Sequence, residues 1–265
     1  MKRGKPFIEI LGSALHGDYK FPILEILTFL FIFSSFVFAS FGGFGGGSGE
    51  YFVLFMVTSL MGLPLFILVM LLLKNIGSGI GNDLEKGIVQ TIFIYPLRRR
   101  SVLSAKLVSA FGMAILLFFV AQMSALLILA PDMVVPNLGL VLLAYLAGVG
   151  SALLIASLCL LTTLILRRGS LAVVVGIMLF FLFGILGSLT SFLATAMHSP
   201  LPIQLYSIVT PITAIEHHYW SIRPDAHTNW APSYPEALMY VGASYAITAS
   251  ILVLSYLYFC RRFNV

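Results

Sequence analysis

Long apolar runs separated by short polar segments dominate this chain. Six of the runs have about 20 residues or more, which is the length that an α-helix needs to cross a bilayer core of about 30 Å. None alternates apolar and polar residues in the way of an outer-membrane β-strand. The pattern predicts an all-α membrane protein with a single transmembrane domain over residues 1–265. The predicted spans are Pro22–Phe41, Tyr51–Leu73, Leu107–Ala130, Leu138–Leu166, Leu171–Met197 and Leu238–Cys260.

A shorter apolar pattern precedes the first span. From Phe7 to Leu15, apolar residues recur every three or four positions, which predicts an amphipathic helix over residues 5–18, lying in the inner membrane interface. Glu9 interrupts this stretch and Lys20 follows it, so we do not expect a cleaved signal peptide.

Composition supports the same fold class. The chain is 60% hydrophobic and only 9% charged, with a mean hydropathy of +1.04, which excludes an ordinary soluble domain. Its two cysteines offer neither a disulfide framework nor the spacing of a metal site. It also lacks the basic motif with interleaved aromatic residues that is typical of nucleic-acid binders, so we expect no nucleic-acid partner.

The distribution of positive charge predicts the orientation. Lys and Arg near the ends of spans are retained in the cytoplasm. If both termini are cytoplasmic, every Lys and Arg except Arg223 falls on the inner side. The basic isoelectric point of about 9.3 is therefore a signal of topology.

The segment over residues 81–106, between the second and third spans, collects seven charged residues. Glycines at alternate positions from 77 to 81 predict that the second helix ends there. Asp83 and Glu85 favour the N-terminus of a new, short amphipathic helix, where unpaired N–H groups attract anions. Pro96 predicts the end of that helix.

A basic cluster, Arg98 to Arg100, follows this predicted helix. It has two interpretations, because three arginines at this position either anchor the third span to anionic headgroups or form part of a binding surface. Anchoring alone does not account for the acidic, glycine-marked part of the segment.

The run Asp83-Leu84-Glu85-Lys86-Gly87 is followed nine positions later by Pro96, then by Arg98 and, on entering the third span, by Lys106. This arrangement resembles the signature of the type-2 ABC permease family of exporters. The order of elements is similar as well: an interfacial helix, six spans, a charged inner element and a large outer loop.

The chain departs from the family's pattern at two positions, Ile88 in place of the usual Thr and Gln90 in place of a common Glu. The resemblance implies that residues 82–100 form a coupling helix, which docks on a cytoplasmic ATPase subunit, and that the protein lies in a prokaryotic plasma membrane. The ATPase-coupling residues would be Asp83, Glu85, Lys86, Gly87, Pro96, Arg98, Arg99 and Arg100.

The source of energy would be a partner. The chain has no Gly-x-x-x-x-Gly-Lys-Ser/Thr loop, so we expect it to be no enzyme by itself and to bind no cofactor. The resemblance implies two copies of an ABC ATPase subunit, which carry ATP and Mg, and a second permease chain that makes a homodimer or a heterodimer.

Small residues at four-residue spacing favour close helix contacts, either between two permease chains or within one. They occur on the fourth and fifth spans: Ala144, Gly148 and Ala152, and Ala172, Gly176, Gly184 and Ser188.

The outer loop, residues 198–237, resembles the paired short outer helices of the same family, with a break at Pro211. These helices would form an outer gate or an exit vestibule. Adjacent histidines on a helix point about 100° apart, which makes a poor chelate, so we favour hydrogen-bonded interfacial histidines over a metal site. The gate residues would be Pro211, Glu216, His217, His218, Tyr219 and Trp220.

The spans contain few polar residues and no ionisable group near mid-membrane, which disfavours ion transport and favours a hydrophobic or amphiphilic cargo. Each hydroxyl or amide could instead bond to a neighbouring helix. The candidates for a translocation path are Gln122, Ser124, Thr58 and Ser59.

We therefore expect the transmembrane subunit of an ATP-driven exporter. The alternative is a membrane subunit of an ABC complex that transmits force to an extracytoplasmic partner without moving cargo. An intramembrane enzyme is a weaker hypothesis, because no residue constellation supports it.

Overall fold

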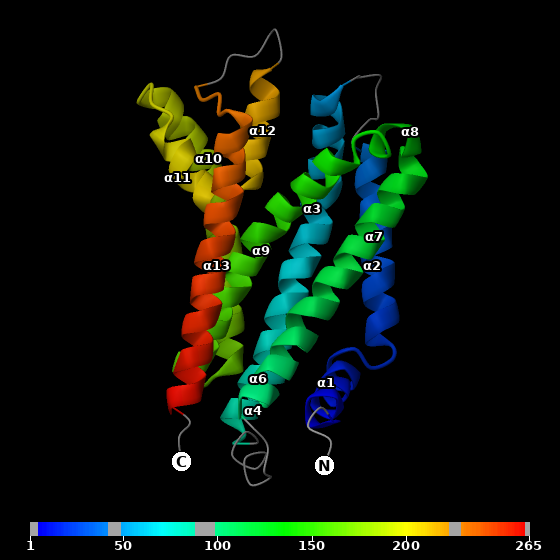
Figure 1. The fold of residues 1–265 in the computed structure, drawn as a ribbon, viewed down its shortest axis with the longest axis vertical. Coiled ribbons are helices and arrows are strands. Elements are labelled where there is room, and N and C mark those ends of the chain that lie inside the picture. Colours follow the sequence, from blue (N-terminus) through cyan, green and yellow to red (C-terminus); the bar gives the residue numbers. More distant parts are fainter. Residues whose placement is uncertain (1–4, 42–48, 88–98, 223–228, 263–265) are drawn as a thin grey trace.

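The structure is a computed structural model that describes residues 5–41, 49–87, 99–222 and 229–262. All regular elements among these residues are helices, and the long ones form a bundle (Figure 1). Five stretches are long and apolar enough to cross a membrane. The chain is thus an all-α, multi-pass membrane protein, as the sequence predicts. The five stretches are Glu50–Glu85, Ser101–Leu129, Leu138–Leu166, Gly169–Ala196 and Tyr234–Arg261.

A sixth span requires two helices to be taken together. Helix α1 (Lys5–Asp18) has the predicted bounds, and α2 (Ile23–Phe41) follows it. Within the described residues, the two helices are long and apolar enough to cross a membrane only when they are taken together. The angle between them is 66°. The bend places α1 at the base of the bundle (Figure 1).

The other helices follow in chain order. They are α3 (Glu50–Lys74), the π-helical segment η1 (Asn75–Gly81), α4 (Asn82–Glu85), α6 (Arg99–Leu107), the π-helical segment η2 (Val108–Gly112), α7 (Met113–Leu129), α8 (Pro131–Val134), α9 (Leu138–Leu166), α10 (Gly169–Ala196), α11 (Leu201–Val209), α12 (Ile212–Ser221) and α13 (Tyr234–Arg262).

The second span does not end at its glycines. Segment η1 joins α3 directly to α4, so Asp83 and Glu85 lie in the last turn of a continuous helix and not at a new N-terminus. The glycines serve close packing instead. A Cβ added to Gly81 would lie 2.3 Å from the Cα of Gly169, and one added to Gly77 would lie 2.4 Å from a methyl of Val173. Only glycine lets the two backbones approach so closely.

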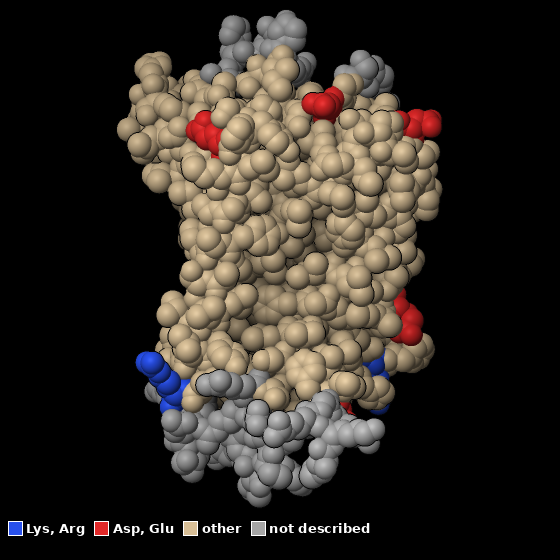
Figure 2. Space-filling view, in the orientation of Figure 1, with Lys and Arg blue, Asp and Glu red and all other residues tan. Residues whose placement is uncertain are grey.

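The two ends of the bundle differ. Helices α1 and α4 and the C-terminal end of α13 share one end, while α8 and α12 lie at the other (Figure 1). On the face that Figure 2 shows, Lys and Arg gather near the end that holds α1 and α4, and acidic residues occur near both ends. A band without charged residues lies between the two ends. This asymmetry agrees with the charge distribution that predicts the first end to be the inner one.

Helix α9 is the central element. It contacts α3, α10 and α13, and it has the predicted bounds. Ala144 and Ala152 are fully buried on it, and a Cβ on Gly148 would meet the Met61 sulfur at 2.8 Å. The small-residue stripe of the fourth span is therefore used inside the subunit.

The stripe on α10 divides into two parts. Gly176 packs on Leu73, and Ala172 is fully buried. Gly184 and Ser188 are exposed, and a Cβ on Gly184 would meet nothing within 4 Å. Ala172 and Gly176 thus pack within the chain, whereas Gly184 and Ser188 lie on the surface of the bundle.

We predict that Gly169→Ala destabilises the fold by about 1–3 kcal/mol, because the new Cβ would lie 2.2 Å from the Gly77 carbonyl oxygen and overpack a backbone contact. Gly184→Ala on the same helix is the matched control, since open space surrounds it and alanine favours helices. Thermal unfolding in detergent measures both. Equal melting temperatures for the two variants would contradict the packing assigned to Gly169.

Candidate functional site

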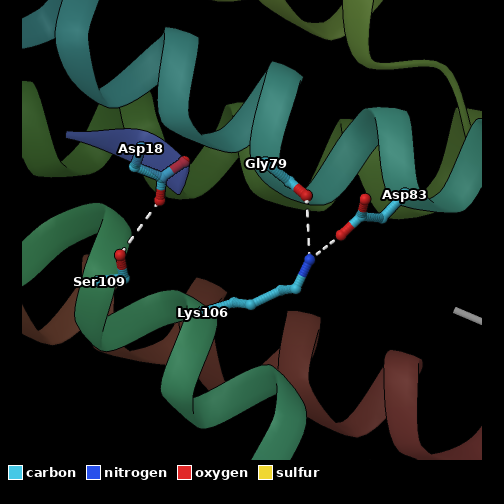
Figure 3. Close-up of polar contacts among 5 residues, drawn as sticks. All are labelled: Asp18, Gly79, Asp83, Lys106 and Ser109. Atoms are coloured by element: carbon cyan, nitrogen blue, oxygen red, sulfur yellow. Dashed lines mark hydrogen bonds and ion pairs between the residues drawn. The ribbon is translucent and has the colours of Figure 1, made fainter. Parts of the chain in front are cut away.

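A polar cluster at the inner end of the bundle joins helices that are far apart in sequence (Figure 3). The Lys106 ammonium on α6 pairs with the Asp83 carboxylate on α4, and it donates a hydrogen bond of 3.2 Å to the Gly79 carbonyl. Both charged side chains are about 20% exposed. Lys106 therefore ties together the helices that lead into and out of the segment between the second and third spans.

Asp18 adds α1 to this cluster. The Ser109 hydroxyl donates to its carboxylate at 3.1 Å, and the Lys74 ammonium donates to its main-chain carbonyl at 2.9 Å. Burial raises the pKa of Asp18, and the Ser109 hydrogen bond and the charges of Lys74 and Lys106 oppose that rise. The interfacial helix is thus fixed to the second and third spans through its last residue.

A buried amide lies beside the ion pair. Asn75 donates from its Nδ2 to the Tyr19 hydroxyl at 2.8 Å and to the Ala110 carbonyl at 3.2 Å. Asn75 begins η1 and Ala110 belongs to η2, and these two π-helical segments contact each other. Such segments often mark functional positions in helices.

The cluster borders a cavity of about 740 Å³ at the inner end. Its lining comes from α1, α2, α3, η1, α4 and α6, and it contains both acidic and basic groups. The polar lining residues are Glu9, Ser13, Asp18, Lys74, Asn75, Ser78, Asp83 and Lys106.

The predicted coupling residues take different positions. Asp83 joins the cluster, whereas Glu85 and Lys86 are exposed at the end of α4. Gly87 has a φ of 69°, a left-handed conformation that suits glycine at a helix end. Pro96 and Arg98 lie outside the described residues. Arg99 and Arg100 form the start of α6.

Sequence reasoning missed Asp18, Asn75 and Ser109 as members of the inner cluster. Each is a polar residue near the border of an apolar run, and the sequence carries no stronger signal for any of the three. A polar residue at that position commonly contacts lipid headgroups or water. Only the packing of α1 against η1 and η2 brings the three together.

A second cavity, of about 340 Å³, lies at the outer end. Glu216 lines it and is a hydrogen-bond partner of Thr58. Burial raises the pKa of Glu216 to about 7, and the Thr58 hydrogen bond only partly opposes that rise. We call this the outer cavity. It is lined by Tyr51, Leu54, Phe55, Thr58, Ser191, Thr195, Ile203, Glu216, His217, Trp220 and Asn229.

Not all predicted gate residues line the outer cavity. Glu216, His217 and Trp220 do, whereas Tyr219 is buried elsewhere. The ring of His218 packs against Tyr219 and Tyr234, and its Nδ1 lies 2.9 Å from the Pro232 carbonyl oxygen.

Two features of the predicted gate follow the sequence closely. Pro211 precedes α12 and separates it from α11, as the break in the sequence predicts. The two adjacent histidines contact different rings: His217 packs on Trp230, whereas His218 packs on Tyr219 and Tyr234. Among the described residues, no group of three His, Cys, Asp or Glu could hold a metal ion.

The predicted path residues are not brought together. Gln122 is fully buried, donates to the Ser35 hydroxyl at 2.5 Å and accepts from the Tyr145 hydroxyl at 3.2 Å, so it links α2, α7 and α9. Ser124 bonds to carbonyls of its own helix. Thr58 lines the outer cavity, and its neighbour Ser59 is partly buried on α3.

No model of a known protein family matches the chain, and no curated protein shows significant sequence similarity to it.

We predict that Lys106→Met lowers stability by about 1–3 kcal/mol, because it leaves the largely buried Asp83 carboxylate without its cation. Asp83→Asn combined with Lys106→Met should cost less than the sum of the two single changes. Thermal unfolding of the four proteins measures this coupling, with the exposed Lys20→Met as control. Additive losses would show that the two side chains do not interact.

The intrinsic fluorescence should titrate with a midpoint near pH 7. Trp220 lines the cavity with Glu216, and the other tryptophan, Trp230, contacts His217. The ordinary pKa of a glutamate is 4.5, and that of Glu216 in the folded protein is about 7. Between these two pH values the folded protein keeps a proton that the unfolded chain has lost. The free energy of unfolding therefore decreases as the pH rises through this range. Glu216→Gln should abolish the transition. Its persistence in that variant would assign it to another group.

Proposed function

We propose that this chain is the transmembrane permease subunit of an ATP-driven ABC exporter in a prokaryotic cell membrane, with both termini in the cytoplasm. A separate ATPase subunit, present in two copies, binds ATP and Mg and supplies the energy. A second permease chain completes the complex. The cargo is hydrophobic or amphiphilic.

The observation that carries this function is the tie made by Lys106. The segment between α4 and α6 is the proposed contact with the ATPase, and Lys106 links the two helices from which it emerges. A lever transmits force to a bundle only if its attachments do not slide past each other. The pairing with Asp83 meets that requirement, and the contact of Lys106 with Gly79 reinforces it.

Exposed charge at the end of α4 supports the same assignment. Glu85 and Lys86 are exposed, while Asp83 two residues earlier is engaged inside the chain. The inner end thus separates charges used for its own fold from charges left accessible to a partner. An accessible, mixed-charge helix end suits docking on a polar cleft, where complementary charges fix the register.

The limited polarity of the membrane-spanning part supports the choice of cargo. Gln122, the buried amide within the third span, has both ends of its side chain engaged with neighbouring helices. Many large apolar side chains of α10 are exposed, including Met178, Ile185 and Phe192. These apolar surfaces suit cargo that moves along or between helices in a lipid-like environment, and a hydrated ion would find few ligands there.

Charge reversal at the proposed docking point tests the function. We predict that Glu85→Lys, and separately the replacement of Arg98, Arg99 and Arg100 by glutamine, abolish copurification with an ABC ATPase that binds the unmodified chain on coexpression. The six-span fold should persist, because Glu85 is exposed. The control is Asp132→Lys, the same reversal at an exposed position on the opposite end. An ATPase that still binds and is stimulated normally would refute the docking assignment.

ATPase turnover in reconstituted vesicles separates transport from force transmission. If the complex exports a compound, that compound should raise the turnover and accumulate on one side of the membrane. Stimulation by an extracytoplasmic protein with no compound moved would favour a subunit that transmits force.

A further inference from the structure

The outer cavity has the dimensions of a small-ligand site. Its volume of about 340 Å³ lies at the lower end of the range for ligand pockets, which suits a headgroup better than a whole lipid. Several of its lining residues, including Phe55, Ser191 and Trp220, are exposed, so it opens to the surface. Phe55 is 45% exposed and forms an apolar part of the lining that reaches the surface. A ligand with a compact head and an apolar chain fits this shape.

Above about pH 7, where Glu216 is ionised, the described lining of the outer cavity carries a negative charge. Among the lining residues that the structure describes, Glu216 is the one carboxylate, and none is a lysine or an arginine. Burial lowers the pKa of His217, which keeps that ring neutral near pH 7, although its contact with the Trp230 backbone opposes the shift. His217 Nδ1 is also buried without a hydrogen-bond partner. Among the described lining residues none offers a cation to the Glu216 carboxylate, and a positively charged ligand would supply one.

Aromatic rings define what kind of cation fits. Trp220 and Tyr51 both line the cavity and meet edge to face, with ring centroids 5.2 Å apart. The face of an indole ring is the best aromatic surface for a cation, and aromatic cages recognise quaternary ammonium groups. Such a group has no N–H to donate, and it gains attraction from the ring and from the carboxylate together.

We propose that the outer cavity binds the quaternary ammonium head of a single-chain cationic amphiphile, with Glu216 as its counter-ion, Trp220 and Tyr51 against its methyl groups, and its chain along Phe55. The binding step does not depend on an ATPase. Only the further statement that such amphiphiles are the exported cargo rests on the proposed function.

The headgroup of a choline lipid carries the same ammonium but adds a phosphate. A phosphate near Glu216 would meet a like charge with no cation among the described lining residues to offset it. We therefore assign the site to a ligand with net positive charge. Three probes with the same chain length distinguish the two kinds of ligand. Hexyltrimethylammonium is cationic, hexylphosphocholine is zwitterionic and hexyl glucoside is neutral.

The experiment is calorimetric titration of the chain alone, in lipid nanodiscs, with empty nanodiscs as the blank for partitioning. Hexyltrimethylammonium should bind at least about tenfold more tightly than the zwitterionic and neutral probes. Glu216→Gln and Trp220→Leu should each weaken binding by about tenfold or more, and Asp132→Asn, an exposed outer charge on α8, should leave it unchanged. Equal affinity for the three probes would overturn the assignment.

A pH series on the unmodified protein tests the same site without relying on the folding of a variant. The ammonium charge is fixed, so lowering the pH from 8 to 6 should weaken binding about tenfold as Glu216, with a pKa of about 7, becomes protonated. Affinity that does not change with pH would overturn the assignment. The other titratable lining groups are His217 of α12, whose pKa is lowered, and Tyr51 of α3.

Other titratable groups on the neighbouring elements lie outside the described lining. Glu50, which is exposed at the start of α3, directly precedes Tyr51 in the chain. Tyr206 of α11 donates to the Phe183 carbonyl, and Glu236 of α13 accepts from the Ser233 amide. Failure here leaves the ATPase docking test untouched, because binding is measured with no ATPase present. Failure to copurify an ATPase likewise leaves the binding result standing.

Discussion

The pairing of Lys106 with Asp83 is the contact on which the inner half of the molecule depends. Lys106 lies where the third span enters the apolar layer, and a cation there is costly unless it meets an acceptor. The acceptors come from the second span: the Asp83 carboxylate and the Gly79 carbonyl. Separation of the two helices would leave the Lys106 cation without these acceptors and raise the free energy, so the pair fixes their spacing. The inner cavity and the polar contacts of Asp18 form around that fixed pair of helices.

The seven residues of η1 combine this tie with the closest helix contact of the bundle's inner end. The Gly79 carbonyl faces Lys106, while Gly77 and Gly81 pack on the first turn of α10 at Gly169. The third and fifth spans are thus both held by one short π-helical stretch. In the proposed exporter, a displacement imposed at α4 would reach both spans through the same residues, since tightly packed elements move as units and do not deform continuously.

One continuous helical stretch, Glu50–Glu85, runs through the bundle and connects the two candidate sites. Tyr51 and Thr58 near its start line the outer cavity, and Asp83 near its end pairs with Lys106. At 1.5 Å per residue, its 36 residues extend about 54 Å. A motion along this rod would change both ends together. That coupling gives a physical route by which nucleotide-driven movement could alter the affinity of an outer ligand site.

The sequence by itself determined most of the helices, though not where the second span ends. Helix α9 over Leu138–Leu166, α1 over residues 5–18 and the division of the outer loop at Pro211 have their predicted bounds, because apolar run length, helical periodicity and proline act locally. Only the tertiary structure decided which polar groups meet and what the glycines do. Gly77 to Gly81 predict a helix end from local propensity, yet the neighbouring α10 makes them a packing surface inside a continuous helix. The ATPase-docking role of residues 82–100 stays a prediction, because it depends on a partner surface.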